Sequence, residues 1–389
     1  MIFKNKFPNA PDVSVVLSGV AVDYNSIESI SFELTEDAHD IASITFAGLI
    51  PNAITDYVGA PVFISIGISQ TRFTSFYGYV SYVSPESITR RGLINNSPFQ
   101  RATVVCFGAS YDMSEKKHTV WESTSIPLIV EKIANRYKYS YSVPNDYFTW
   151  NRLLQDGISD WDFLKQVCSS VGYCVHVSGT HINIYDPYTL LARKLPYVEL
   201  LSLRGTNADV TYGPGRIMEF SGTFGDVTPD GTSADYEYTG IDSSGKAVVV
   251  YVGTEYSTKL GEVVPAGYTH YETVNTGSVE MLTKYAVGKM KKRYPYNAKV
   301  IITGVPDPIP GSIAKVNNYD SKFDGLWIVK SVKHTVTRSN YLTEVTIATD
   351  STNDATPSIT PTTPFVTPPV PTLLDNVWIA SQMDAVVYA

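Results

Sequence analysis

Apolar and polar residues alternate along most of the first 115 residues, which is typical of β-strands with one buried face. In the run PVFISIGI, every second residue from Val62 to Ile68 is apolar and falls on one side of an extended chain. Similar runs, separated by Gly, Pro, Asn and Ser, occupy residues 28–37, 42–49, 76–85 and 101–108. The first two of these runs are expected to pair. Many short strands with such turn residues predict a small antiparallel β-barrel over residues 1–115.

The period of the pattern changes from two to about 3.6 after residue 125. In STSIPLIVEKIANRYKY the apolar residues of one helix face are Ile126, Ile129, Val130, Ile133, Ala134 and Tyr137. Pro127 fits the first turn of this helix, where its missing N–H costs nothing. We therefore predict an amphipathic helix here, inside an α/β domain that spans residues 116–205 and contains two helices and a β-hairpin.

The second helix of that domain is predicted to begin after Ser159. Ser159 is followed three residues later by Asp162, which resembles a capping box with Asp in place of Glu, and Asp160 adds negative charge at the positive end of the helix. One face of the helix then carries Trp161, Leu164, Val167, Cys168 and Val171. Gly172 stands where a left-handed C-cap is needed. The runs YCVHV and HINIYD follow as two strands joined by the turn SGT.

Alternating patterns return from residue 206, and residues 206–224 with 297–350 predict a second antiparallel barrel. Residues 225–296 form a polar, Gly-rich insertion that ends in a helix with Val279, Leu282, Ala286 and Met290 on one face. Residues 351–372 are a Thr/Pro-rich linker, which we expect to be extended. Residues 373–389 regain apolar character and are expected to dock on a neighbouring protein. The candidate docking residues are Leu373, Leu374, Val377, Trp378, Ile379, Val386, Val387 and Tyr388.

The first and last β regions have a similar order of elements. Both run strand, turn, strand, turn, strand, and Gly78 in one region and Gly325 in the other precede an alternating apolar stretch. Sequence identity between them is low. The pattern therefore leaves two interpretations open, a duplicated barrel or the general likeness of small antiparallel barrels.

Composition narrows the class of protein. A chain of 389 residues with 43% hydrophobic and 17% charged residues is folded and long enough for several domains. The net charge of −8 gives no electrostatic reason to bind nucleic acid or an anionic membrane, although it suits a lumen through which DNA slides. The start, MIFKNKFPNAPDV, lacks the apolar region of a secretory leader, and no run of about 18 apolar residues predicts a membrane span.

Signatures of catalysis are missing from the sequence. It contains no G-x-S-x-G, HExxH or P-loop motif, and its six histidines are scattered. The three cysteines, Cys106, Cys168 and Cys174, are an odd set without CxxC, which favours reduced thiols over a disulfide framework. Zinc needs a tighter group of ligands than the Cys-x5-Cys-x-His spacing that ends at His176 provides. We expect no catalytic, metal or cofactor site and no enzyme.

The run GISDWDFLKQVCSSVGYCVHVSGTHINIYDP resembles the centre of the phage late control D / VgrG-type baseplate hub family, with Ser-Asp-Trp-x-Phe-Leu at a helix start, a Gly at its end and an Asp-Pro after the hairpin. The stretches PIPGSIAKV, FDGLWIVKSVKHTV and YLTEVTI are similar to the C-terminal part of that family. The positions that carry the resemblance are Ser159, Asp160, Trp161, Phe163, Leu164, Gly172, Gly311, Gly325, Trp327 and His334. The resemblance covers residues 1–350.

The resemblance implies a mainly β fold with α+β insertions, in which two related small antiparallel barrels and α/β domains form a tail-hub architecture. It implies a homotrimeric ring that adapts a sixfold tail tube, or a distal tail protein, to a threefold central spike or fibre. DNA would pass through the lumen without specific binding. The protein would lie at the tail tip of the virion and in the host cytoplasm during assembly, with no membrane anchor.

Two other classes stay open at this point. A tail-tip cell-wall hydrolase or glycan-binding protein would use the 27 tyrosines for stacking on sugars. A secreted β-rich adhesin is disfavoured by the missing leader and the odd number of cysteines.

Overall fold

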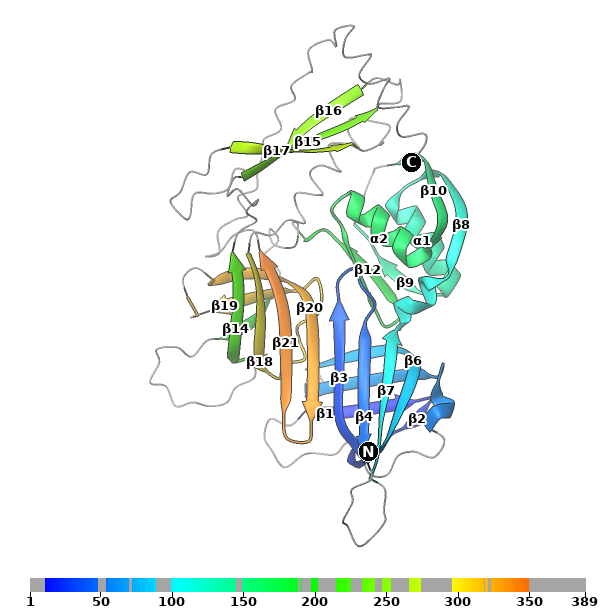
Figure 1. Ribbon diagram of the computed structural model, residues 1–389, viewed down its shortest axis with the longest axis vertical. Helices are drawn as coiled ribbons and strands as arrows, with labels where there is room; N and C mark the ends of the chain where they lie inside the picture. The colour runs from blue at the N-terminus through cyan, green and yellow to red at the C-terminus, as the bar shows by residue number, and fades with distance from the viewer. Residues whose placement is uncertain are drawn as a thin grey trace. The chain divides into compact units, whose positions relative to one another are not determined.

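The computed structural model describes residues 11–47, 54–69, 72–88, 99–144, 149–187, 190, 197–201, 215–224, 233–241, 247–252, 266–273, 296–317, 319–320 and 323–349. The chain divides into two compact units. The larger one comprises Met1–Asp226 and Lys291–Ser358, and the smaller one comprises Val227–Met290 and Ile359–Ala389. Figure 1 shows the strands and helices that the following paragraphs name.

The first barrel forms where the sequence pattern predicts strands. Its elements are β1 (Asp12–Leu17), β2 (Val20–Ala21), η1 (Tyr24–Ser26), β3 (Ile27–Thr35), β4 (Ile41–Ala47), η2 (Ile54–Tyr57), β5 (Pro61–Ser69), β6 (Arg72–Ile88) and β7 (Phe99–Gly108). Val62, Ile64 and Ile66 on β5 are buried, as their alternation predicts. They share one hydrophobic core with apolar residues of β1, β3, β4, β6 and β7. The predicted pairing of residues 28–37 with 42–49 is confirmed by the antiparallel β3–β4 ladder.

The second barrel is built from strands that flank the smaller unit in sequence. These are β13 (Tyr197–Leu201), β14 (Ile217–Phe224), β18 (Tyr296–Thr303), β19 (Ile313–Asn317), β20 (Gly325–Thr337) and β21 (Tyr341–Thr349). They enclose a core of their own, in which Val300, Trp327 and Val345 are fully buried. Each barrel therefore has a hydrophobic core of its own.

The two barrels have the same strand order. Neighbouring strands run β3-β4-β7-β6-β5 in the first barrel and β14-β18-β21-β20-β19 in the second. Each strand of the second series follows the same sequence order as its equivalent in the first. The equivalent pairs are β3 and β14, β4 and β18, β5 and β19, β6 and β20, and β7 and β21.

Register irregularities coincide as well. The β3–β4 ladder shifts between Ile27 and Ser29, and the β14–β18 ladder shifts at the same place, between Ile217 and Glu219. A second shift, between residues 80 and 82 on β6, has its equivalent between residues 329 and 331 on β20. A β-bulge adds one residue to one strand, so each bulge fixes the alignment of two ladders residue by residue.

The turns that lead into β5 and β19 also match. Gly59 has a φ of 82° and donates its N–H to the Val80 carbonyl at 2.8 Å. Gly311 has a φ of 80° and donates its N–H to the Val329 carbonyl at 2.9 Å. A general likeness of small barrels does not place bulges and a left-handed glycine at matching positions. The two barrels are related copies.

This alignment corrects the comparison of Gly78 with Gly325 made from the sequence. Because Val80 is equivalent to Val329, Gly78 is equivalent to Trp327, and Gly325 is equivalent to Phe76. Gly78 also lies inside β6 and does not precede it. Gly78 has a local reason of its own, because an added Cβ there would lie 2.0 Å from the Phe107 carbonyl oxygen.

The α/β part follows the first barrel. It comprises η3 (Ala109–Ser114), β8 (Lys116–Thr124), α1 (Ile126–Tyr137), β9 (Ser140–Ser142), β10 (Trp150–Ser159), α2 (Asp160–Ser170), β11 (Cys174–Ser178) and β12 (His181–Tyr185). Both helices and the β11–β12 hairpin confirm the elements predicted from the sequence. The antiparallel β8–β10 ribbon and β9, which pairs in parallel with β12, were not predicted.

Pairing between β3 and β20 joins the two barrels into one 13-stranded sheet. Ser331 to Thr337 run antiparallel to Thr35 to Ser29. In Figure 1 this junction is the place where the blue β3 stands beside the orange β20. The sheet therefore continues from one hydrophobic core to the other.

The smaller unit contains a three-stranded sheet of β15 (Ser233–Ile241), β16 (Ala247–Val252) and β17 (Ala266–Thr273), in the order β16-β15-β17. The helix predicted around Val279–Met290, the linker 351–372 and the docking segment 373–389 lie outside the described residues. No helix among the described parts of the chain is long and apolar enough to cross a membrane.

Candidate functional site

The first group of motif residues lies at the start of α2. Ser159 is the N-cap of this helix, and its Oγ accepts the Asp162 N–H at 3.0 Å. The same hydroxyl donates to Asp162 Oδ2 at 2.7 Å, which lowers the pKa of the Asp162 carboxyl. The N-cap half of the predicted capping box is confirmed, and the Asp162 carboxylate accepts from the Ser159 hydroxyl. Asp162 therefore belongs to the helix end.

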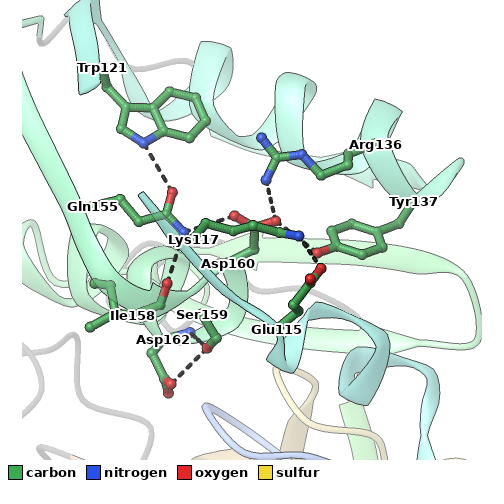
Figure 2. Close-up of polar contacts among 10 residues, drawn as sticks. All are labelled: Glu115, Lys117, Trp121, Arg136, Tyr137, Gln155, Ile158, Ser159, Asp160 and Asp162. Carbon is green, nitrogen blue, oxygen red and sulfur yellow. Dashed lines mark hydrogen bonds and ion pairs between the residues drawn. The ribbon is translucent and has the colours of Figure 1, made fainter. Parts of the chain in front are cut away.

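Asp160 is fully buried. Both of its carboxylate oxygens accept hydrogen bonds, which Figure 2 draws as dashed lines. Its Oδ2 accepts from Arg136 at 2.5 Å and from the Tyr137 hydroxyl at 2.8 Å, and its Oδ1 accepts from Gln155 Nε2 at 2.9 Å. Gln155 in turn accepts the Trp121 indole N–H at 3.2 Å. A buried carboxylate costs several kcal/mol unless it is paired. This network ties α1 and β10 to the first turn of α2.

The remaining motif residues of this group form the core of the α/β part. Trp161, Phe163 and Leu164 are buried, and the Phe163 ring stacks on Trp121 with centroids 5.4 Å apart. Trp161 also stacks on His39, whose ring belongs to the β3–β4 turn. Gly172 has a φ of 82° and ends α2 in the left-handed conformation that was predicted.

The second group of motif residues lies in the second barrel. Gly311 allows the β19 turn to approach the Tyr185 ring, where an added Cβ would lie 2.7 Å from it. Gly325 opens β20, and Trp327 is buried with its indole N–H on the Phe323 carbonyl at 2.9 Å. The two groups of motif residues thus sit in different cores and do not converge on one cavity.

His334 is a buried histidine of β20. Its Nδ1 lies 3.0 Å from the Tyr341 hydroxyl, its ring lies 5.0 Å from Phe32, and its Nε2 has no hydrogen-bond partner. Burial lowers the pKa of His334 to about 3, so the ring is neutral at ordinary pH. His334 stands at the β20–β3 junction and contributes packing there.

The residues that connect the barrels to the α/β part carry no motif that predicts this role. We call Glu36, Asp37, Asp40, His176, Tyr185 and Lys330 the three-way joint. Glu36 Oε1 pairs with Lys330 Nζ of β20 at 2.6 Å, and Glu36 Oε2 accepts from the Tyr185 hydroxyl of β12 at 2.6 Å. One carboxylate of the β3–β4 turn therefore holds an element of the second barrel and an element of the α/β part. Burial and the adjacent Glu36 raise the pKa of Tyr185.

Two further contacts complete the three-way joint. Asp37, at a φ of 57°, donates its N–H to the Val175 carbonyl at 2.8 Å and accepts the Val175 N–H on Oδ1 at 2.9 Å. Asp40 Oδ2 lies 3.5 Å from His176 Nε2, an ion-pair distance without hydrogen-bond geometry, and both side chains are buried. The only sequence signal was an acidic run, TEDAHD, at the turn between two predicted strands. The residues that Glu36, Asp37 and Asp40 meet in the three-way joint lie more than 100 residues away.

Glu36, Asp37 and Cys174 bring three potential metal-ligand atoms within 4.8 Å of one another. Both oxygens of Glu36 are already taken by Lys330 and Tyr185, and Asp37 Oδ1 accepts a backbone N–H. The Cys174 thiol is buried and free of a disulfide. The carboxylates of Glu36 and Asp37 therefore form polar contacts that connect the β3–β4 turn to neighbouring strands. The docking residues Leu373–Tyr388 lie outside the described residues.

No protein-family model matches the sequence, and no curated protein matches it. Solved structures match its fold. A tail protein from Neisseria meningitidis aligns with 88% of this chain and 97% of its own, at 12% identity and a TM-score of 0.64. A 43 kDa tail protein of prophage MuSo2 from Shewanella oneidensis aligns with 88% of this chain and 99% of its own, at 12% identity and a TM-score of 0.62.

A third match is an Escherichia coli component of the type VI secretion system, described as structurally similar to tail proteins of bacteriophage T4. It covers 83% of this chain and 73% of its own, at 13% identity and a TM-score of 0.52. The chain thus has the fold of phage tail proteins and of a type VI secretion component. The mainly β fold with two related barrels, expected from the motif resemblance, is confirmed.

Proposed function

We propose that the protein is a structural baseplate or tail hub of a bacteriophage tail or of a related contractile injection machine, and not an enzyme. The fold it shares with two tail proteins over nearly their whole length supports this role. The polar residues of the three-way joint and of the Asp160 network support it too, because their carboxylates bind donors of the chain itself. The division into domains with boundaries at residues 115, 205, 224, 296, 350 and 372 is part of the proposal.

The protein assembles as a homotrimeric ring that adapts sixfold to threefold symmetry. The observation that carries this step is the matched register of the two barrels in one chain. Two equivalent barrels in each of three chains present six similar faces on one side of a ring. A sixfold tail tube, or a distal tail protein, can bind that side, while a threefold spike or fibre binds the other.

DNA passes through the lumen of this ring without specific binding, in keeping with the net charge of −8. The ring lies at the tail tip of the virion after assembly in the host cytoplasm. Residues 373–389 dock on a neighbouring tail protein, so their deletion leaves the ring intact and weakens attachment to that neighbour.

Native mass spectrometry of the purified protein tests the ring. We expect a species of three chains, and a single chain at all concentrations up to tens of micromolar would overturn the proposal. The same preparation is incubated with bacterial cell walls. Release of reducing ends by the purified protein would favour the tail-tip hydrolase instead.

A further inference from the structure

Several strand edges of the larger unit have no partner strand among the described residues, and two of them lie on β14 and β6, the equivalents of β3 and β20. One end of the strand order is β14, which pairs with β18 on one side and has no strand of the described residues on the other. On β6, pairing with β5 stops at Tyr79, so residues 82–88 have β7 on one side and none of the described strands on the other. Open edges of this length are templates for pairing with another chain.

The chain itself contains the pattern for closing such edges. Residues 331–337 of β20 pair antiparallel with residues 29–35 of β3. By the register alignment of the two barrels, β6 residues 82–88 are equivalent to β20 residues 331–337. Likewise, β14 residues 219–224 are equivalent to β3 residues 29–34. The two open edges are thus the counterparts of the two edges that are joined inside the chain.

We propose that β6 of one copy pairs antiparallel with β14 of the next copy, in the register of the internal β20–β3 junction. This inference rests on the proposed ring and specifies the contact between its neighbouring copies. Transferring the internal register places Ser84 opposite Thr223 and Pro85 opposite Gly222. The contact is head-to-tail, because different edges meet, and such contacts close into rings when the rotation allows it.

Backbone directions support this pairing. The Glu36 N–H donates to the Lys330 carbonyl across the internal junction, so every second residue from Lys330, including His334, points its backbone at β3. Pro85 is the equivalent of His334 and therefore directs its nitrogen at the open edge. Proline is tolerated on edge strands because no donor is needed there, and it limits indiscriminate pairing. Its carbonyl remains free to accept from Gly222 of the next copy.

The same alternation makes Lys333 and Glu33 a pair without mutual hydrogen bonds. Ser84 and Thr223 are the equivalent pair at the proposed joint, and both are exposed in the single chain. Cα atoms of such pairs lie about 4.5 Å apart, within the range that a disulfide spans. The native thiols Cys106, Cys168 and Cys174 are buried and will not compete.

The test is a double variant, Ser84→Cys with Thr223→Cys, oxidised mildly and analysed on non-reducing gels beside native mass spectrometry. The matched control is Ser84→Cys with Ser221→Cys, which keeps both thiols exposed but shifts the register by two residues, to about 7–8 Å. We expect a covalent three-chain species in the first variant, reversed by reductant, and at least about tenfold less cross-link in the control.

The outcomes separate this inference from the proposed function. A three-chain ring without cross-linking at residues 84 and 223 overturns the joint and leaves the ring standing. Equal cross-linking of the two variants overturns the register. A single chain in native mass spectrometry overturns both the joint and the ring.

Discussion

Where the first barrel has Gly78, the second has Trp327, and where the first has Phe32, the second has Gly222. Gly78 is needed because β6 and β7 approach so closely that a Cβ would meet the Phe107 carbonyl. Trp327 is buried in the equivalent place. Two bulges recur in both barrels, while the large side chains stand on different strands. The register of the backbone is therefore what the two copies share.

The two barrels also differ in a titratable group. His334 in the second barrel is equivalent to Pro85 in the first. In the second barrel this position is buried at the β20–β3 junction. In the first barrel the same position is exposed on the open edge of β6. The comparison teaches that the same strand position is core in one copy and exposed edge in the other.

The largest expected effect comes from Trp327→Ala, which leaves a cavity in the second core. We expect the free energy of unfolding to fall by about 3–5 kcal/mol, measured by urea denaturation. Trp327→Phe is the control and should lose much less, since it keeps most of the buried volume. A loss below about 1 kcal/mol for the alanine variant would show that the second core does not depend on the residue that replaces Gly78.

The next effect is a pH dependence carried by His334, which has no titratable equivalent in the first barrel because Pro85 stands there. The folded His334 has a pKa of about 3, against about 6.5 in an unfolded chain. Below pH 6.5 the unfolded chain binds a proton that the folded chain refuses, so stability falls as the pH drops and continues to fall toward pH 3.

Between pH 7.5 and 4.5 this amounts to about 2–3 kcal/mol. Urea midpoints of the native protein and of His334→Gln at both pH values measure it. The variant should lose less stability on acidification, and parallel losses in the two proteins would contradict the account.

The smallest effect compares two equivalent glycines. Gly59→Ala should cost about 1–2 kcal/mol, because alanine resists a positive φ and nothing else lies within 4 Å of its Cβ. Gly311→Ala should cost about 1 kcal/mol more, because its Cβ would also displace the Tyr185 ring. Thermal and urea melts of the two variants provide the difference. Equal costs would show that the β19 turn does not press on Tyr185.

Local patterns predicted much of this fold. The helix at Ile126–Tyr137, the cap at Ser159 and the left-handed Gly172 depend on neighbours within a few residues, and the structure contains all three. The β8–β10 ribbon escaped prediction because its pattern is mixed. Val120 and Leu154 face each other across it and are 46% and 61% exposed, so apolarity there does not mark a buried face.

Long-range partners were not predictable in this way. Glu36 meets Tyr185 and Lys330, which are 149 and 294 positions away in the chain. The duplication was visible only as a similar order of strands, and matching Gly78 with Gly325 was wrong by two positions. Pairing partners and bulges align the two barrels, and neither can be read from residue identity at this level of divergence.

The most direct test of the central claim is an end-on image of the purified assembly by cryo-electron microscopy. The account predicts six equally spaced barrels around one lumen. When threefold symmetry is imposed, first and second barrels should alternate around the ring. A ring of three densities, or barrels unevenly spaced around the axis, would contradict it.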